Sequence, residues 1–230
     1  FPTSAVYGSV PEEGISEDCL YLNVLTSATR PDAKHPVIVW FHGGGLTSGA
    51  GTTASTNGPA LPRMDNVVVT LNHRIGPIGF MAPPLLLKES DKGTSGNYGS
   101  LDLIAALQWV QRNIAAFGGD PDNVTIMGVS GGGQKTLWCM ASPLAKGLFH
   151  RSIVMSGGVG GTPLSETEAM GQALAEKLGV SNEGDVLAAM RAKPWQEIIR
   201  AAGGRGGPYR SVFTLDGWSL ESVSALSDSP

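Results

Sequence analysis

The sequence predicts an α/β fold with a mostly parallel sheet and flanking helices. Short runs rich in β-branched residues alternate along the chain with longer helical patterns, as expected for strands joined by crossover helices. Glycine is abundant at 32 of 230 residues, about twice the usual share of roughly 7 %. Two glycine clusters directly follow predicted strands. Because open α/β sheets bind ligands at the carboxyl ends of their strands, these clusters predict a site there.

The predicted elements follow from hydrophobic periodicity and from turn residues. Strands are predicted at residues 20–25, 37–41, 67–71, 124–127 and 153–155. A helix is predicted over 101–117, because Leu103, Leu107, Val110 and Ile114 recur on one helical face. Further helices are predicted over 165–179, where Ser165 and Glu168 fit a capping box, and over 185–193 and 195–202. Residues 203–208 are a predicted loop and no linker is evident, so the chain is expected to form a single domain over 1–230.

Composition excludes several classes of partner and cofactor. The net charge is −4 and the chain has no basic block, which disfavours nucleic-acid binding. No apolar run approaches the roughly 18 residues of a membrane span. The two cysteines, Cys19 and Cys139, lie far apart in the chain and give neither a disulfide scaffold nor a zinc motif. No metal or cofactor is expected.

The second glycine cluster contains a candidate nucleophile. Gly128-Val129-Ser130-Gly131-Gly132 fits the pattern G-x-S-x-G after a predicted strand. In this motif a sharp strand-to-helix turn exposes the serine hydroxyl, and the residues two before and two after it must be small. A phosphate-binding loop is excluded, because Gln134 stands where that motif needs glycine before Lys135.

The first glycine cluster supplies what such a serine needs. His42-Gly43-Gly44-Gly45 follows the strand predicted at 37–41, and loops of this H-G-G-G type donate backbone N–H groups to an oxyanion hole. Glycine lets the chain approach a substrate oxygen without a side chain in the way. Together the two motifs predict acyl-transfer chemistry at Ser130 on a small-molecule ester.

Several further stretches together resemble the type-B carboxylesterases, the family that includes the cholinesterases, and the likeness is dense from about residue 13 to residue 158. They are Ser16-Glu17-Asp18-Cys19-Leu20-Tyr21-Leu22-Asn23-Val24, Asn72-His73-Arg74-Ile75-Gly76, Gly96-Asn97-Tyr98-Gly99-Ser100-Leu101-Asp102, Phe117-Gly118-Gly119-Asp120-Pro121 and Gly147-Leu148-Phe149-His150-Arg151. The resemblance implies an α/β-hydrolase fold that is incomplete at the C-terminus. It also implies a serine esterase with Ser130 as the nucleophile and with the amides of Gly44, Gly45 and Gly131 as the oxyanion hole.

The resemblance implies further roles and also shows departures. Arg74 and Asp102 match a structural salt bridge of the family, and Ser156 matches a serine behind the active site. Cys19 matches a cysteine whose disulfide partner lies upstream of this chain, so it is expected to be unpaired. Val129 replaces the glutamate that often precedes the nucleophile, as in bacterial and fungal esterases. No tryptophan precedes the 16–24 signature, which disfavours choline esters.

The acid and the base of a catalytic triad are not evident in the chain. His150 is the only histidine after Ser130, and its place in the order Ser, Asp/Glu, His argues against it. Asp216 is expected to be a turn residue. The acid and base are therefore expected beyond Pro230 or on a second polypeptide, and the isolated chain is expected to be inactive. A non-catalytic adhesion or binding module is the alternative from another class, and amidase or thioesterase chemistry stays open.

Overall fold

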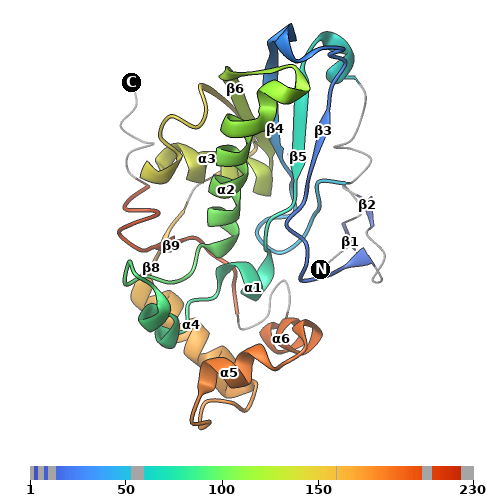
Figure 1. Ribbon diagram of the computed structural model, residues 1–230. Helices are drawn as coiled ribbons and strands as arrows, with labels where there is room; N and C mark the ends of the chain where they lie inside the picture. The colour runs from blue at the N-terminus through green and yellow to red at the C-terminus, as the bar shows by residue number, and fades with distance from the viewer. Residues whose placement is uncertain are drawn as a thin grey trace.

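The chain folds around a central five-stranded sheet (Figure 1). The computed structural model describes residues 3–4, 8–9, 14–52, 60–158, 160–203 and 209–223. Across the sheet the strands follow in the order β3 (Leu22–Leu25), β5 (Val67–Leu71), β4 (His35–Phe41), β6 (Gly119–Val129) and β7 (Arg151–Met155). β3 runs antiparallel to β5, and the other three pairs are parallel. The predicted mostly parallel sheet is confirmed.

The remaining elements are short strand pairs and helices. β1 (Thr3–Ser4) pairs with β2 (Gly8–Ser9), and β8 (Thr162–Pro163) pairs with β9 (Thr214–Leu215). The α-helices are α1 (Gly76–Phe80), α2 (Tyr98–Asn113), α3 (Gly131–Ala141), α4 (Leu164–Lys177), α5 (Val186–Arg191) and α6 (Trp195–Ala202). Short 3₁₀ helices span Pro31–Ala33, Pro62–Met64, Pro84–Glu89, Ile114–Phe117 and Pro143–Ala145.

The main hydrophobic core lies between the sheet and the helices α2 and α3, which contact β6 and each other. Every residue of β5 is buried, as expected for a strand covered on both faces. The four residues that predicted the helical face of α2 are all fully buried. They are Leu103, Leu107, Val110 and Ile114. The helical periodicity therefore identified the face that packs on the sheet.

A second, smaller core is formed by the helices α4, α5 and α6. Its buried residues include Leu174, Met190 and Ile198. In Figure 1 these helices gather at the lower end of the view, on the same side as α1, which follows β5. They therefore lie toward the carboxyl ends of the parallel strands, the edge where the sequence places the site.

The capping box predicted at Ser165 and Glu168 is wrong. Helix α4 begins at Leu164, and its N-cap is Pro163, without a side-chain cap. Pro163 pairs with Leu215 in the β8–β9 ladder, so the backbone stays extended up to that residue. Ser165 consequently lies inside the first turn, where its hydroxyl does not cap the helix.

Two other predicted boundaries differ from the structure. The helix predicted over 101–117 begins at Tyr98, and its last turn, Ile114–Phe117, is 3₁₀. The strand predicted over 124–127 extends from Gly119 to Val129. His35 of β4 pairs with Gly119, and a register irregularity follows between His35 and Val37. Asp120 and Pro121, which follow the end of the predicted helix, are therefore part of β6.

Candidate active site

Ser130 occupies the turn between β6 and α3, at the carboxyl end of the strand. Its φ of 56° and ψ of −119° make it one of the few non-glycine residues with a positive φ, a strained conformation found mainly at functional sites. Its N–H donates to the Met155 carbonyl at 2.8 Å, and its carbonyl accepts from the Gln134 N–H at 3.0 Å. The side chain is exposed, so the hydroxyl faces solvent beside the N-terminus of α3.

The glycines around Ser130 allow the elbow to form. A β-carbon at Gly128 would lie 2.5 Å from the Gly132 carbonyl carbon, and one at Gly132 would collide with the Phe41 carbonyl oxygen. Both obstacles are backbone atoms, which cannot move aside as a flexible side chain can. The small residues required two before and two after the serine are therefore explained by direct backbone contact.

The loop after β4 lies directly against this elbow. A β-carbon at Gly131 would collide with the Gly45 amide nitrogen and would lie 2.5 Å from the Gly45 α-carbon. Gly44 and Gly45 both have a positive φ, 92° and 62°. The Gly44 carbonyl accepts from the Ser48 N–H at 3.1 Å and from Ser48 Oγ at 3.0 Å. The structure thus brings two sequence-predicted oxyanion residues, Gly45 and Gly131, into backbone contact, with Gly44 adjacent in the chain.

The amides of Gly44, Gly45 and Gly131 have no competing acceptor among the described backbone carbonyls. In the described ranges, no backbone acceptor receives a hydrogen bond from the Gly44 or Gly45 N–H. Gly131 is the first residue of α3, and the first N–H groups of a helix have no partner within it. Such amides attract negative charge. The arrangement can hold an oxyanion that forms next to the Ser130 hydroxyl.

Three buried basic side chains lie behind the loop. The rings of His42 and His73 stack with centroids 4.7 Å apart, and Lys135 Nζ donates to the His42 carbonyl at 2.9 Å. Each histidine Nδ1 lies 2.8 Å from a carbonyl oxygen, that of Gly43 or that of Arg74. Because a carbonyl only accepts, both Nδ1 atoms carry the proton.

Burial lowers the pKa of each of these three groups. Desolvation is the main cause and the charge of the nearby Lys135 is the second. Together they lower the pKa of His42 to about 3 and the pKa of His73 well below its usual value. Desolvation also lowers the pKa of Lys135 to about 7. Loss of hydration disfavours the charged form of a base. The two histidines are therefore neutral at physiological pH.

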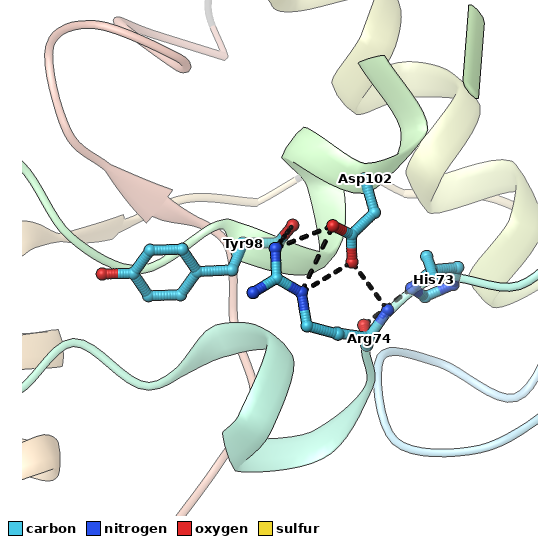
Figure 2. A network of polar contacts seen from close by, with 4 residues as sticks. All are labelled: His73, Arg74, Tyr98 and Asp102. Atoms are coloured by element: carbon cyan, nitrogen blue, oxygen red, sulfur yellow. Dashed lines mark hydrogen bonds and ion pairs between the residues drawn. The ribbon is translucent and has the colours of Figure 1, made fainter. Parts of the chain in front are cut away.

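Arg74 and Asp102 form the expected salt bridge between the segment after β5 and helix α2 (Figure 2). The guanidinium Nη2 and Nε donate to the carboxylate at 2.7 and 2.9 Å, and the Arg74 backbone N–H donates at 2.8 Å. The hydrogen bonds to Asp102 raise the pKa of Arg74. The guanidinium carbon also lies 5.6 Å from the Tyr98 ring centroid. The bridge fixes a framework and holds no reacting group.

His150 lies at the wrong end of the sheet to serve as a base for Ser130. It directly precedes β7, where its N–H donates to the Val124 carbonyl and its Nδ1 accepts from the Val124 N–H. Ser130 follows the opposite end of β6, six residues further along the strand. At about 3.3 Å per residue, this separation is roughly 20 Å.

Asp216 is a turn residue, as expected. One of its carboxylate oxygens accepts from the N–H groups of Trp218, Ser219 and Leu220 at 2.7 to 3.0 Å. The other accepts from Ser219 Oγ at 2.6 Å. No side chain in the described ranges hydrogen-bonds to Ser130 Oγ.

A hollow of about 460 Å³ opens next to the oxyanion loop. Gly45 and Gln134, from the two halves of the site, line one side, and residues 160–162 and 209–213 line the other. Among the described residues of this lining, Arg210 is the charged one. The volume is of the size that holds small ligands.

The other predicted residues lie as follows. Ser156 directly follows Met155, whose carbonyl accepts the hydrogen bond from the Ser130 N–H. Ser156 is therefore one residue away from a direct contact of the elbow. Cys19 and Cys139 do not form a disulfide with each other. Across the described residues, no helix combines the length and apolarity needed to cross a membrane. The same residues contain no cluster of metal-binding side chains.

Sequence reasoning missed Lys135 and His73 as members of the site. The helical period would have placed Lys135 on the buried face of α3, because Gly131, Trp138 and Cys139 share that face and are buried. His73 has no comparable signal. It is buried because the segment after β5 lies beneath the loop after β4.

Comparisons with known proteins agree with this geometry. The model of the carboxylesterase family matches residues 2–217. The chain is 42 % identical over 200 residues to the para-nitrobenzyl esterase of Bacillus subtilis, covering 86 % of this chain and 39 % of that protein. It is 43 % identical over 174 residues to the fumonisin B1 esterase of Sphingopyxis macrogoltabida, covering 75 % of this chain and 32 % of that protein.

The solved structures give the same result. A PNB esterase structure superposes with a TM-score of 0.80 and 37 % identity over 90 % of this chain and 44 % of that one, which confirms the α/β-hydrolase fold. The chain thus spans between about a third and two fifths of the length of the two curated relatives. With the family model matching nearly the whole chain, the protein belongs to the carboxylesterase family.

Proposed function

We propose that this chain carries the nucleophile and the oxyanion hole of a serine carboxylic-ester hydrolase. The observation that supports the proposal most directly is the close backbone contact between Gly45 and Gly131, the residue that follows Ser130. Ester hydrolases of the carboxylesterase family are its relatives. The proposed substrate is a small-molecule carboxylic ester.

The proposed reaction proceeds through an acyl-enzyme. Ser130 Oγ attacks the ester carbonyl carbon while its proton passes to a base, and the carbonyl oxygen becomes an oxyanion. The N–H groups of Gly44, Gly45 and Gly131 stabilise that oxyanion, and each donor of this kind contributes about 2.7–4 kcal/mol. The alcohol then leaves with a proton from the conjugate acid of the base. Water attacks the ester of Ser130 and releases the carboxylic acid.

The base and its orienting carboxylate are proposed to follow Pro230 in the same polypeptide. A serine hydroxyl is a weak nucleophile without an adjacent base, and the histidines of this chain are unsuited to that role. His42 and His73 are buried with both Nδ1 protons donated to carbonyls, and His150 lies near the far end of β7. The comparisons give no support to a second polypeptide.

A fluorophosphonate probe tests the proposed function in the full-length protein. The probe should label Ser130, as identified by peptide mass spectrometry, and Ser130→Ala should abolish both labelling and hydrolysis of p-nitrophenyl butyrate. Ser165→Ala, at an exposed position in α4, is the matched control and should keep both. A wild-type protein that is not labelled at Ser130 would instead support the non-catalytic binding module.

A further inference from the structure

Lys135 is a fully buried lysine that links the two halves of the site. It lies on α3, five residues after Ser130. Its Nζ donates a 2.9 Å hydrogen bond to the carbonyl oxygen of His42, the residue directly before Gly43. The bond therefore joins the helix that begins at the elbow to the loop that carries the Gly44 and Gly45 amides.

Packing alone does not account for a lysine at this position. None of the ion pairs between described residues involves Lys135, and burial lowers its pKa to about 7. An amine without a counter-ion is costly to bury, and an apolar side chain would fill the same space at lower cost. The hydrogen bond to the His42 carbonyl is the interaction that the amine adds.

The loop depends on its neighbours for its position. Gly44 and Gly45 have no side chains and adopt positive φ values, so only backbone contacts, such as those of the Gly44 carbonyl with Ser48, hold them. The His42 ring is held by its bond to the Gly43 carbonyl and by stacking on His73. The His42 carbonyl belongs to the peptide unit that leads into Gly43. Holding that oxygen therefore fixes the orientation from which the next two peptides continue.

We propose that Lys135 is a positioning residue for the oxyanion hole. Its amine holds the His42–Gly43 peptide against α3, so that the amides of Gly44 and Gly45 point to the same place as the amide of Gly131. The inference rests on the proposed ester hydrolysis at Ser130. Oxyanion donors act more strongly on the transition state than on the substrate. Loss of the positioning contact should therefore lower kcat and leave KM nearly unchanged.

Lys135→Met in the full-length protein tests this role, because methionine keeps a long unbranched side chain but has no N–H donor. The kinetic constants for p-nitrophenyl butyrate and the inhibition constant of a trifluoromethyl ketone, which binds as an oxyanion, are measured together. We expect kcat to fall about 10- to 100-fold, with KM within twofold of the wild type. The inhibition constant should rise by a similar factor.

Two control variants separate positioning from general stability. Cys139→Ala removes a buried side chain one turn further along α3, and Lys177→Met removes an exposed lysine from α4. Both should keep kcat within twofold, even if Cys139→Ala lowers the melting temperature. If Lys135→Met does not fold, Lys135→Leu provides the same comparison with a smaller side chain.

The outcomes distinguish this inference from the proposed function. A Lys135 variant with wild-type kcat and wild-type ketone inhibition overturns the positioning role, whatever its melting temperature. Equal losses of kcat in Lys135→Met and Cys139→Ala would also overturn it, since they would reflect packing. A wild-type protein that hydrolyses no ester and is not labelled at Ser130 overturns the proposed function, and the inference with it.

Discussion

At the scale of single residues, burial decides which charged groups the fold depends on. The Asp102 side chain is 7 % exposed and accepts hydrogen bonds from both the guanidinium and the backbone N–H of Arg74 (Figure 2). The Glu89–Arg191 pair is as short, at 2.6 Å, yet its side chains are 46 % and 60 % exposed. A buried carboxylate that loses its charge leaves donors unsatisfied, whereas water replaces an exposed partner.

Asp102→Asn should therefore destabilise the protein, and Glu89→Gln should not. Asparagine presents an N–H₂ group where Asp102 now accepts from Arg74. Removing one partner of a buried pair costs about 3–5 kcal/mol. The Arg74 side chain is partly exposed, which reduces the expected loss to about 1–3 kcal/mol. Urea unfolding measures both variants, and an Asp102→Asn midpoint no lower than that of Glu89→Gln would contradict the argument.

The sequence indicated the proposed reacting residues better than the residues that support them. Ser130, Gly44, Gly45 and Gly131 could be predicted because each needs a particular backbone geometry, and that need leaves glycine in a recognisable spacing. Lys135 was missed because its role depends on a carbonyl far away in the chain. A lysine in a helix usually lies in solvent, and only the tertiary contact with His42 shows otherwise.

At the scale of elements, α3 packs on the chain after β7 through backbone contacts. A β-carbon at Gly157 would lie 2.5 Å from the Gly133 carbonyl carbon, and one at Gly133 would lie 2.7 Å from the Met155 carbonyl oxygen. Met155 also accepts the hydrogen bond from the Ser130 N–H. The position of α3 and the position of Ser130 thus depend on the same short segment.

Gly157→Ala and Gly158→Ala test this packing with neighbouring residues. A β-carbon at Gly157 has no room, whereas one at Gly158 meets nothing within 4 Å. Gly157→Ala should lower the free energy of unfolding by about 1–3 kcal/mol, as overpacking does, and should slow fluorophosphonate labelling of Ser130. Gly158→Ala should stay within about 0.5 kcal/mol of the wild type. Equal stability of the two variants by urea unfolding would refute the close contact.

Element types were predictable, but several ends were not. The strand predicted over 67–71 matches β5 at both ends, since all of its residues are buried and apolar or small. β6 extends beyond its predicted 124–127 because β4 pairs with it from Gly119 onward. The start of α4 was misplaced because β8 keeps Pro163 extended. For β6 and α4, pairing with a strand that is distant in the sequence sets the end of the element. The local sequence therefore does not predict that end.

At the scale of the whole molecule, the described residues contain the proposed nucleophile and the proposed oxyanion amides. Ser130 and these amides converge at one edge of the sheet, and no base among the described residues hydrogen-bonds to the Ser130 hydroxyl. At the outer side of the described sheet, the residues Ile153 and Val154 of β7 are 47 % and 36 % exposed to solvent. An oxyanion hole without a base still stabilises a transition state, but it does not turn a serine hydroxyl into an effective nucleophile.

The 230-residue chain on its own should therefore hydrolyse p-nitrophenyl acetate no faster than its Ser130→Ala variant. Comparison with that variant is essential, because exposed lysines also react slowly with this ester. Far-UV circular dichroism and cooperative urea unfolding establish whether the isolated chain is folded before rates are compared. The full-length protein, assayed in parallel, should exceed its own Ser130→Ala variant by orders of magnitude. If the folded 230-residue chain turned over the ester at the full-length rate in a Ser130-dependent way, the base would have to lie within these residues. The buried His42–His73 pair would then be the first place to look, because its Nε2 atoms are the ones left without a proton.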